Sequence, residues 1–407
     1  MQTPPFHRRI LPWIFIIVFL VAAPALVFYT AGYRWNPKKD KVERQGTLIL
    51  DSIPNNARIS LNGNPLSKTT PLTLQNVSPG RYVIRFDKDG YHPWQKQLDV
   101  QSEYVTFAND IRLWKQAEPQ LTNLGAATLL EASPDQRYIA FINTSGTNST
   151  LKIWDAERNQ IRSTVISTEA EKSRPNIDLS ATLEMTDVRI LWAENSRSFV
   201  IENLLPNESW RVDVDNLEIE HLSQEKENDN LTILHTPGTE DLVLFTKQDP
   251  DRWIVLPPGD WTFYNEIQSG VILRSGSDWI SLDPKSDSPT IHKAQGDALR
   301  LFGRSGQGRY LLKKDGEIWI WDPTEQPELI LRDSKPLSEV TWYSSGKDVI
   351  LATEQSVSML NLDPRDGRIR TELANFDRVY DIALINKKIY IAGEKDAQNG
   401  IWSLEIE

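Results

Sequence analysis

From about Glu118 to Glu407 the sequence repeats a degenerate unit of short, alternating apolar segments. Each copy has a first strand, a turn rich in Ser, Pro, Gly and Asp, an apolar second strand, a polar loop and a third strand that ends at Asp or Asp-Pro. The copies follow one another at intervals of about 30 to 60 residues, near the ~40 residues of a β-propeller blade. Such units bury their apolar faces only by stacking, so residues 118–407 are predicted to form one propeller.

We count seven copies, with six or eight as alternatives because the third and fourth are short. They begin near residues 129, 190, 233, 270, 300, 340 and 381. The last copy stops at its third strand, and the segment Leu121–Leu124 precedes the first copy as an extra strand. We therefore predict that Leu121–Leu124 pairs with the last copy and closes the ring without an exposed edge.

The ends of the third strands carry a further signal. The Trp-Asp pairs at 154–155 and 321–322 resemble the third-strand endings of WD40-like and TolB-like propellers. Asp-Pro steps stand at 283–284, 322–323 and 363–364. Proline stops a strand and Asp caps a turn, so these steps are predicted to form turns.

A second all-β region precedes the repeats. Residues 46–115 alternate with a period of two between Pro-Asn-Asn, Asn-Gly, Ser-Pro-Gly and Asp-Gly turns, which predicts a small β-sandwich of about six strands. Over residues 46–113 its order resembles the PEGA domain family. The matching positions read Ser52-x-Pro54-x-x-Ala57-x-Ile59-x-Leu61-Asn62-Gly63, Thr70-Pro71, Pro79-Gly80-x-Tyr82-x-Ile84 and Lys88-x-Gly90-Tyr91.

This resemblance implies an extracytoplasmic module of cell-surface and envelope proteins, and it implies no catalytic residue. The sequence has Pro54-Asn55-Asn56-Ala57 where the family has Pro-Glu-Gly-Ala. Asparagine tolerates the left-handed conformation that a turn glycine usually supplies, so we expect the turn to be kept.

An apolar segment lies at the N-terminus. Residues 10–33 form an uncharged segment that is long enough to cross a hydrocarbon core. We therefore predict an uncleaved membrane anchor. A signal peptide cleaved at Ala23-Pro24-Ala25 is the alternative. Residues 1–9 are predicted to be a short tail, and its Arg8 and Arg9 favour a cytoplasmic location for the N-terminus. Residues 34–45 are predicted to be a charged juxtamembrane linker, which is also basic. The expected topology places the bulk of the chain outside the cytoplasm.

Composition excludes several classes. The formal net charge is −11, and phosphate binding needs a basic surface, so nucleic acid is not an expected partner. The chain has no cysteine, which excludes disulfides, thiol nucleophiles and Cys-ligated metals.

Each residue that could belong to a functional site is better explained by a structural role. The histidines lack metal-ligand spacing, and His92 is predicted to lie on the surface. The sequence Gly303 to Arg309 favours a hairpin turn over a phosphate loop, because no helix follows it. Asp213-x-Asp215-Asn216 lacks the glycine and downstream glutamate of a calcium loop. We therefore predict no catalytic, cofactor-binding or metal-binding residue. The histidines are His7, His92, His221, His235 and His292.

Tryptophans at strand positions are predicted to pack between blades. An exposed one at the propeller mouth would instead favour carbohydrate binding. The residues concerned are Trp94, Trp114, Trp192, Trp253, Trp279, Trp319 and Trp342.

These observations favour a membrane-anchored envelope protein, held through residues 10–33, whose propeller is a non-catalytic binding or scaffold module. The expected partner is an envelope protein or a glycan, and no cofactor is expected. Two alternatives stay open: a purely structural envelope protein, and a propeller enzyme with its site at the central mouth.

Overall fold

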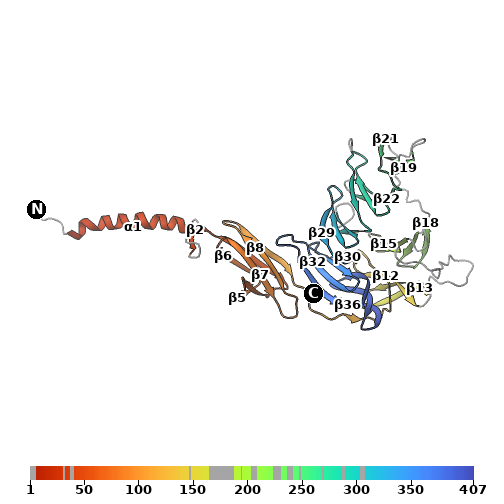
Figure 1. Cartoon of the computed structure of the whole chain (residues 1–407), viewed down its shortest axis with the longest axis horizontal. Helices are drawn as coiled ribbons and strands as arrows, with labels where there is room; N and C mark the ends of the chain where they lie inside the picture. Colours follow the sequence, from red (N-terminus) through yellow and green to blue (C-terminus); the bar gives the residue numbers. More distant parts are fainter. Residues whose placement is uncertain are drawn as a thin grey trace, which may run out of the picture. The chain divides into compact units, whose positions relative to one another are not determined.

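The computed structural model describes residues 6–30, 33–36, 41–145, 148–164, 188–193, 195–202, 209–222, 231–235, 242–246, 249–267, 270–286, 289–302 and 308–407 (Figure 1). These residues form one helix and 36 strands. The chain divides into two compact units, the first made of Met1–Gln116 with Pro364–Gly367 and the second of Ala117–Asp363 with Arg368–Glu407. Each unit is described by itself below.

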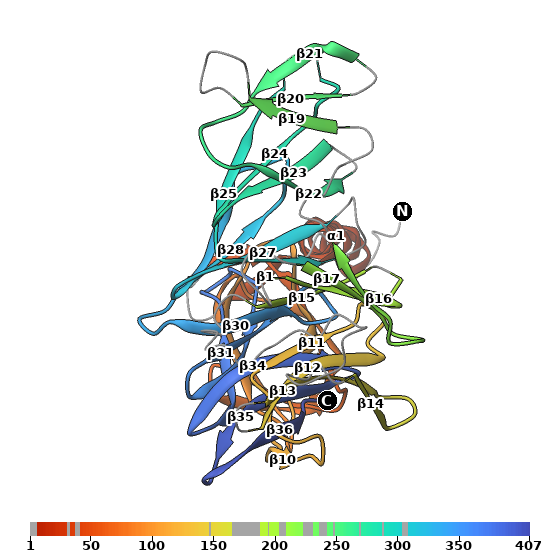
Figure 2. The ribbon, with the colours of Figure 1, turned by 90° about the vertical axis from the view of Figure 1, so that its right-hand side faces the viewer.

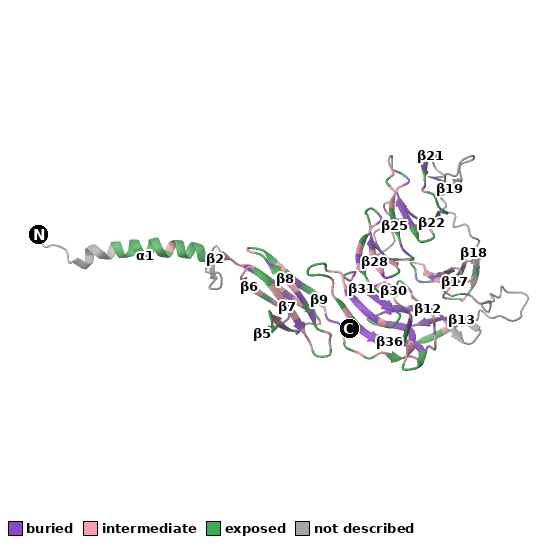
Figure 3. Cartoon of the chain, in the orientation of Figure 1, coloured by how far each residue is buried: buried purple, intermediate pink, exposed green. Residues whose placement is uncertain are grey.

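Helix α1 (Phe6–Thr30) carries the uncharged N-terminal segment. Its stretch Trp13–Thr30 is long and apolar enough to cross a membrane, and none of that stretch is buried, as Figure 3 shows. A signal sequence meets the same criterion. The helix begins before the predicted residue 10 and ends before the predicted residue 33. At its C-terminal end, the hydroxyl of Thr30 donates to the carbonyl of Val27 (3.0 Å), and Gly32, a weak helix former, follows in the sequence.

The predicted linker over residues 34–45 contains regular structure. Strand β1 (Tyr33–Asn36) pairs antiparallel with β2 (Lys41–Arg44). The register sets Tyr33 opposite Arg44, whose guanidinium lies 4.7 Å from the centre of the Tyr33 ring. Because this segment lacks apolar alternation, its sequence did not predict the hairpin.

Residues 46–112 form a sandwich of seven strands, one more than the approximate six predicted. One sheet has the order β6-β3-β9, and β3 and β9 run parallel. The other has the order β5-β4-β7-β8. The strands are β3 (Gly46–Ile53), β4 (Arg58–Leu61), β5 (Asn64–Thr69), β6 (Leu72–Val77), β7 (Gly80–Asp87), β8 (Trp94–Val100) and β9 (Val105–Arg112).

Alternation of apolar residues produces the sandwich core. Leu48 and Leu50 of β3, Ile59 of β4 and Ile84 of β7 are buried, and each of these four is at most 1% exposed. The turn residues also behave as predicted: Asn56 has φ +65°, and the Asn62-Gly63 turn has φ +50° and +79°. Asparagine thus supplies the left-handed conformation where the family has glycine.

The second unit contains seven consecutive antiparallel sheets in the described residues. Sheet 1 has β11 (Leu129–Ala132), β12 (Tyr138–Ser145), β13 (Asn148–Asp155) and β14 (Gln160–Thr164). Sheet 2 has β15 (Arg189–Trp192), β16 (Ser198–Glu202), β17 (Ser209–Asp213) and β18 (Ile219–Leu222). Sheet 3 has β19 (Leu231–His235), β20 (Leu242–Thr246) and β21 (Asp249–Val255).

The remaining sheets continue the same order, strand after strand (Figure 2). Sheet 4 has β22 (Thr262–Ile267), β23 (Gly270–Ser275), β24 (Asp278–Leu282) and β25 (His292–Gln295). Sheet 5 has β26 (Ala298–Phe302), β27 (Arg309–Lys314), β28 (Glu317–Trp321) and β29 (Glu328–Arg332). Sheet 6 has β30 (Leu337–Trp342), β31 (Asp348–Thr353), β32 (Ser356–Asn361) and β33 (Arg370–Asn375). Sheet 7 has β34 (Arg378–Ile385), β35 (Lys388–Lys395), β36 (Gln398–Glu405) and β10 (Gln120–Leu121).

A series of four-stranded meanders is the topology of a β-propeller, as predicted. The fourth copy is longer than its sequence pattern indicated, since its first strand is β22, which precedes the predicted start at residue 270. Sheet 3 has three described strands, so the number of blades stays a prediction.

Backbone contacts repeat between sheets, which explains why the repeat is visible in the sequence. In three sheets the turn between the first and second strands is closed by the same backbone hydrogen bond. The donor and acceptor residues are Ser133 and Tyr138 (2.8 Å), Ala193 and Ser198 (2.9 Å), and Tyr343 and Asp348 (3.1 Å).

The predicted pairing of the segment before the first copy with the last copy is confirmed. Gln120 pairs with Ser403 and Leu121 with Trp402, so β10 is the outer strand of sheet 7 (Figure 2). The pairing strand is shorter than the predicted Leu121–Leu124 and begins one residue earlier. Leu124 is nevertheless buried in the apolar cluster shared by sheets 1 and 7.

Candidate functional site

One open depression in the described residues of the second unit is a pocket of about 560 Å³. It adjoins sheets 1, 6 and 7. Its lining residues are Thr128, Pro336, Leu337, Ser338, Glu354, Arg378, Val379 and Tyr380.

Topology places these residues together. Ser338 and Arg378 lie at the starts of β30 and β34, Thr128 directly precedes β11, and Glu354 lies in the turn between β31 and β32. In an antiparallel meander, the start of the first strand and the turn between the second and third strands lie at the same end of the sheet. The pocket therefore opens at one end of three neighbouring sheets, and we call this end the mouth.

Hydrogen bonds between sheets hold the pocket walls. The carbonyl of Glu354 in sheet 6 accepts the N–H of Val379 in sheet 7 (2.6 Å). Asp381, only 4% exposed, accepts the N–H of Leu130 in sheet 1 (2.7 Å). Because these bonds join rigid strands, the side chains above them have a fixed spacing.

Arg378 and Tyr380 form the polar wall of the pocket. The Arg378 guanidinium lies over the Tyr380 ring, 5.3 Å from its centroid. The Tyr380 hydroxyl donates to Glu394 (2.6 Å), and burial together with this bond raises the pKa of Tyr380. Within the described residues, the exposed guanidinium of Arg378 makes no hydrogen bond or ion pair. It is therefore a positioned cation whose five donors face solvent.

The carboxylate of Glu354 is likewise exposed and, within the described part of the chain, has no side-chain partner. The pocket thus presents one cation and one anion above buried Leu337 and Val379. Next to it, Lys313 donates to the carbonyl of Ser338 (2.7 Å) and lies 4.0 Å from Glu339. That ion pair fastens sheet 5 to the start of β30. The site can therefore hold a ligand that combines charged and apolar groups.

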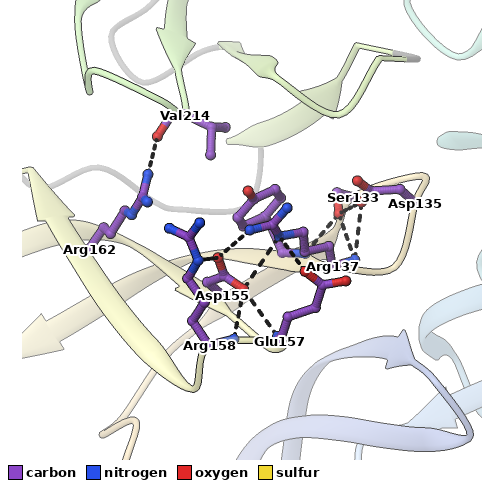
Figure 4. Close-up of polar contacts among 9 residues, drawn as sticks. Ser133, Asp135, Arg137, Asp155, Glu157, Arg158, Arg162 and Val214 are labelled. Carbon is purple, nitrogen blue, oxygen red and sulfur yellow. Dashed lines mark hydrogen bonds and ion pairs between the residues drawn. The ribbon is translucent and has the colours of Figure 1, made fainter.

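A second polar cluster surrounds Asp155, at the end of β13 (Figure 4). Asp155 is fully buried and accepts from the Arg137 guanidinium (3.0 Å) and from the N–H groups of Glu157 (3.0 Å) and Arg158 (3.1 Å). Burial alone raises the pKa of this carboxyl, but the bonds from Arg137 and the backbone outweigh it and leave the pKa lowered. These contacts of Asp155 join the ends of β12 and β13 and the turn that follows β13, so we assign the cluster to the fold.

Most of the predicted turn residues do what the sequence indicated. At the ends of the third strands, each carboxylate accepts from the backbone N–H two residues further on: Asp213 from Asp215 (2.9 Å), Asp283 from Lys285 (2.9 Å) and Asp322 from Thr324 (3.0 Å). Asp213 also accepts from the N–H of Asn216 (3.1 Å). These bonds form turns, and both bonds at Asp213 are accepted by its Oδ1.

The prediction for His92 needs correction. It is half-buried, its backbone N–H donates to the carbonyl of Trp114 (2.7 Å), and burial lowers its pKa. Its Nε2 is buried and has no hydrogen-bond partner among the described residues. The residue packs at the corner that Tyr91 forms with Lys115, which is why it leaves the surface.

The other candidates are distributed without forming a site. Residues 303–307 lie outside the described residues, and Arg309 begins β27, as the hairpin interpretation requires. The side chains of His7, His221 and His235 are also outside the described residues, and His292 is half-buried. No cluster of His, Asp or Glu able to hold a metal ion occurs in the described parts of the chain.

The tryptophans pack as predicted wherever their side chains are described. Trp94, Trp114, Trp279 and Trp342 are at most 7% exposed. Trp192 and Trp319 are half-buried against apolar clusters, and the side chain of Trp253 lies outside the described residues. None of the described ones lines the pocket, so a carbohydrate platform at the mouth has no support from them.

Sequence reasoning missed Arg378, Tyr380 and Glu354. None of them belongs to a recognisable motif. Aligning the seven copies by strand would have indicated them, because the starts of first strands converge at the mouth.

Comparison with known proteins supports the domain assignment of the first unit. Residues 45–115 match the PEGA domain family, which confirms the resemblance seen over residues 46–113. No curated protein matches the chain in sequence.

Two solved structures are similar to the chain. One is a chain of the crystal structure of the Mitotic Checkpoint Complex, with 13% identity and a TM-score of 0.42, covering 71% of this chain and 92% of that one. The other is the Myceliophteria thermophila Cps50 (Swd1) beta-propeller domain, with 15% identity and a TM-score of 0.43, covering 70% of this chain and all of that one.

Proposed function

We propose that this protein is a non-catalytic binding protein anchored in a membrane of the cell envelope, and that its mouth pocket captures a segment of a protein partner. The observation that carries the proposal is Arg378, an exposed cation oriented by Tyr380 beside an apolar floor. A bidentate bond to a carboxylate is the interaction that such a guanidinium favours.

A protein partner fits this pocket better than a glycan. A peptide segment offers a carboxylate for Arg378, an N–H or cation for Glu354, and an apolar side chain for the floor at Leu337 and Val379. Sugar binding uses aromatic faces, and the aromatic residue in the pocket lining, Tyr380, has the Arg378 guanidinium over its ring. Anchoring adds to affinity, since it confines the propeller near envelope partners and raises their effective concentration.

Topology completes the proposal. Arg8 and Arg9 lie in the first turn of α1, ahead of its uncharged stretch, and basic residues at that end of a spanning helix favour the cytoplasm. Both units would then lie outside the cytoplasm, and the match of residues 45–115 to the PEGA domain family supports this topology.

A site-specific photo-cross-linker tests the pocket. We would place it at Ser338, and as a matched control at exposed Ser344, which lies at the opposite end of the same sheet. The proposal expects a protein adduct from Ser338 that disappears in Arg378→Ala and is absent from Ser344. Adducts of equal yield from both positions, or a hydrolase, lyase or oxidoreductase activity abolished by Arg378→Ala or Glu354→Ala, would overturn it.

A further inference from the structure

The end of the first unit that receives the chain from α1 has an unusual combination of contacts. The ring of Phe28, in the last turn of the helix, meets the ring of Tyr33 edge-on, with centroids 5.3 Å apart. In the β1–β2 hairpin, Tyr33 pairs with Arg44, and the Arg44 guanidinium lies 4.7 Å from the centre of the Tyr33 ring. The helix end is thereby connected to the start of the sandwich through side chains as well as through the backbone.

The loop between β8 and β9 completes this connection. Glu103 forms an ion pair with Arg44, and its N–H donates to the carbonyl of Gln45 (3.1 Å). The hydroxyl of Ser102 donates to the carbonyl of Arg44 (2.9 Å). The N–H of Thr47 donates to the carbonyl of Tyr104 (3.0 Å). Four contacts thus fasten this loop to the segment that leaves the helix.

Strand direction shows which end of the domain the loop occupies. Strands β3 and β9 are parallel, with Thr47 opposite Val105, so both begin at the same end of their sheet. The chain enters β3 from the hairpin that follows α1. The loop that precedes β9 therefore lies at the helix-facing end of the sandwich.

This loop presents apolar side chains to solvent. Tyr104 is 66% exposed and Val105 is 45% exposed. An exposed tyrosine beside an aliphatic residue is typical of groups that sit at the level of lipid headgroups, where the ring is buried and the hydroxyl stays hydrated.

Charge favours the same surface. Residues 1–45 contain seven Lys and Arg but only two Asp and Glu, which leaves 38 and 54 respectively for residues 46–407. An anionic bilayer attracts the basic segment around α1 and repels the acidic remainder. The helix-facing end, next to this basic segment, is therefore the end at which charge favours contact with lipid.

We propose that the β8–β9 loop, residues 101–104, is a lipid-contacting element that inserts Tyr104, with the adjoining Val105, into the headgroup region of an anionic membrane. The Arg44–Glu103 pair positions this loop. The inference rests on the proposed role of α1 as a membrane anchor.

The cysteine-free chain permits a direct test. Single cysteines at Tyr104 and Val105 are labelled with an environment-sensitive fluorophore in the full-length protein, reconstituted in vesicles of phosphatidylcholine with and without phosphatidylglycerol. Asn55→Cys, exposed in the turn that follows β3 at the far end of that strand, is the matched control, and Leu20→Cys in α1 reports insertion. We expect a blue shift and quenching by spin-labelled lipid at 104 and 105, stronger with phosphatidylglycerol, and neither at 55.

Glu103→Gln and Arg44→Ala test the positioning role. Each should reduce quenching at 104 while leaving quenching at 20 unchanged. Quenching at 20 with a water-like signal at 104 and 105 would overturn the lipid-contact inference and leave the anchor intact. Absence of quenching at 20 would instead refute the anchor itself, so the two failures are distinguishable.

Discussion

Thr122 donates its hydroxyl to the carbonyl of Ile401, 279 residues further along the chain, at 2.6 Å. The same carbonyl accepts the backbone N–H of Thr122 (2.9 Å). Together with the pairing of Leu121 and Trp402, these bonds fasten the beginning of the second unit to its last strand. The stability of the propeller therefore depends on a short segment at its N-terminal edge.

We predict that Thr122→Ala destabilises the propeller by about 1 kcal/mol, the usual contribution of one hydrogen bond. Thr122→Ser keeps the hydroxyl and should unfold almost like the wild type. Denaturant unfolding of the purified chain, followed by tryptophan fluorescence, measures both. If the alanine and serine variants unfold at the same midpoint, the hydroxyl does not contribute to closure.

The buried carboxylate of Asp155 predicts a pH-dependent contribution to stability. Its folded-state pKa is lowered, so the contribution is present above the unfolded-state pKa of about 3.9 and is lost as the pH falls through the lower folded-state pKa. We expect Asp155→Asn to be clearly less stable than wild type at pH 7. Thermal unfolding between pH 7 and pH 3 should show this difference shrinking below about pH 4. A difference that stays constant over that range contradicts the assignment.

Backbone conformation makes a prediction at Asn56, whose φ is +65°. The left-handed conformation costs an alanine about 1 kcal/mol, and alanine lacks the side-chain hydrogen bonds by which asparagine offsets this cost. Asn56→Ala should therefore lower the free energy of unfolding of the sandwich. Asn56→Gly should be tolerated, because glycine adopts this conformation freely. Amide hydrogen exchange of β3 and β4 measures the effect on this domain alone, and equal exchange in both variants would count against it.

The pocket predicts a separation of binding from stability. Arg378→Ala should weaken partner capture about tenfold, since a hydrogen bond to a charged group contributes about 1.5 kcal/mol. Arg378→Lys should recover only part of this, because lysine keeps the charge and loses the planar fork. The thermal midpoint should change little in both, because the exposed guanidinium makes no hydrogen bond or ion pair within the described residues and its stacking on the Tyr380 ring contributes only about 0.5 kcal/mol. Capture that is unaffected by either variant would exclude Arg378 from recognition.

The proposed topology predicts the pattern of proteolysis. Protease added to intact cells or spheroplasts should digest the region after Lys41 and spare the N-terminal tail. Immunoblots with tags at each end record the fragments, and a cytoplasmic protein serves as the lysis control. Protection of the propeller until the membrane is lysed would show the opposite orientation.

The amino-acid sequence by itself determined the elements that depend on local periodicity. Alternating apolar residues predicted the sandwich around Leu48 and Ile84, the uncharged run predicted α1, and repeated turns predicted the propeller and its closing strand. These predictions succeed because each strand or helix buries one set of side chains, or presents it to lipid, and the spacing of that set is recognisable in the sequence. The hairpin after α1 and strand β22 were not predicted, because their stability comes from the strands they pair with and not from a pattern in their own sequences.

Tertiary structure alone decided the site. Arg378, Tyr380, Glu354 and Thr128 occupy ordinary strand-end positions in the sequence, and nothing local distinguishes them from similar residues in other copies. They become neighbours because three antiparallel sheets place corresponding ends side by side, as the bonds of Val379 to Glu354 and of Leu130 to Asp381 show. His92 follows the same rule, since the turn at Tyr91 moves it inward. Burial and proximity arise from contacts between distant segments, and a short sequence pattern carries no record of them.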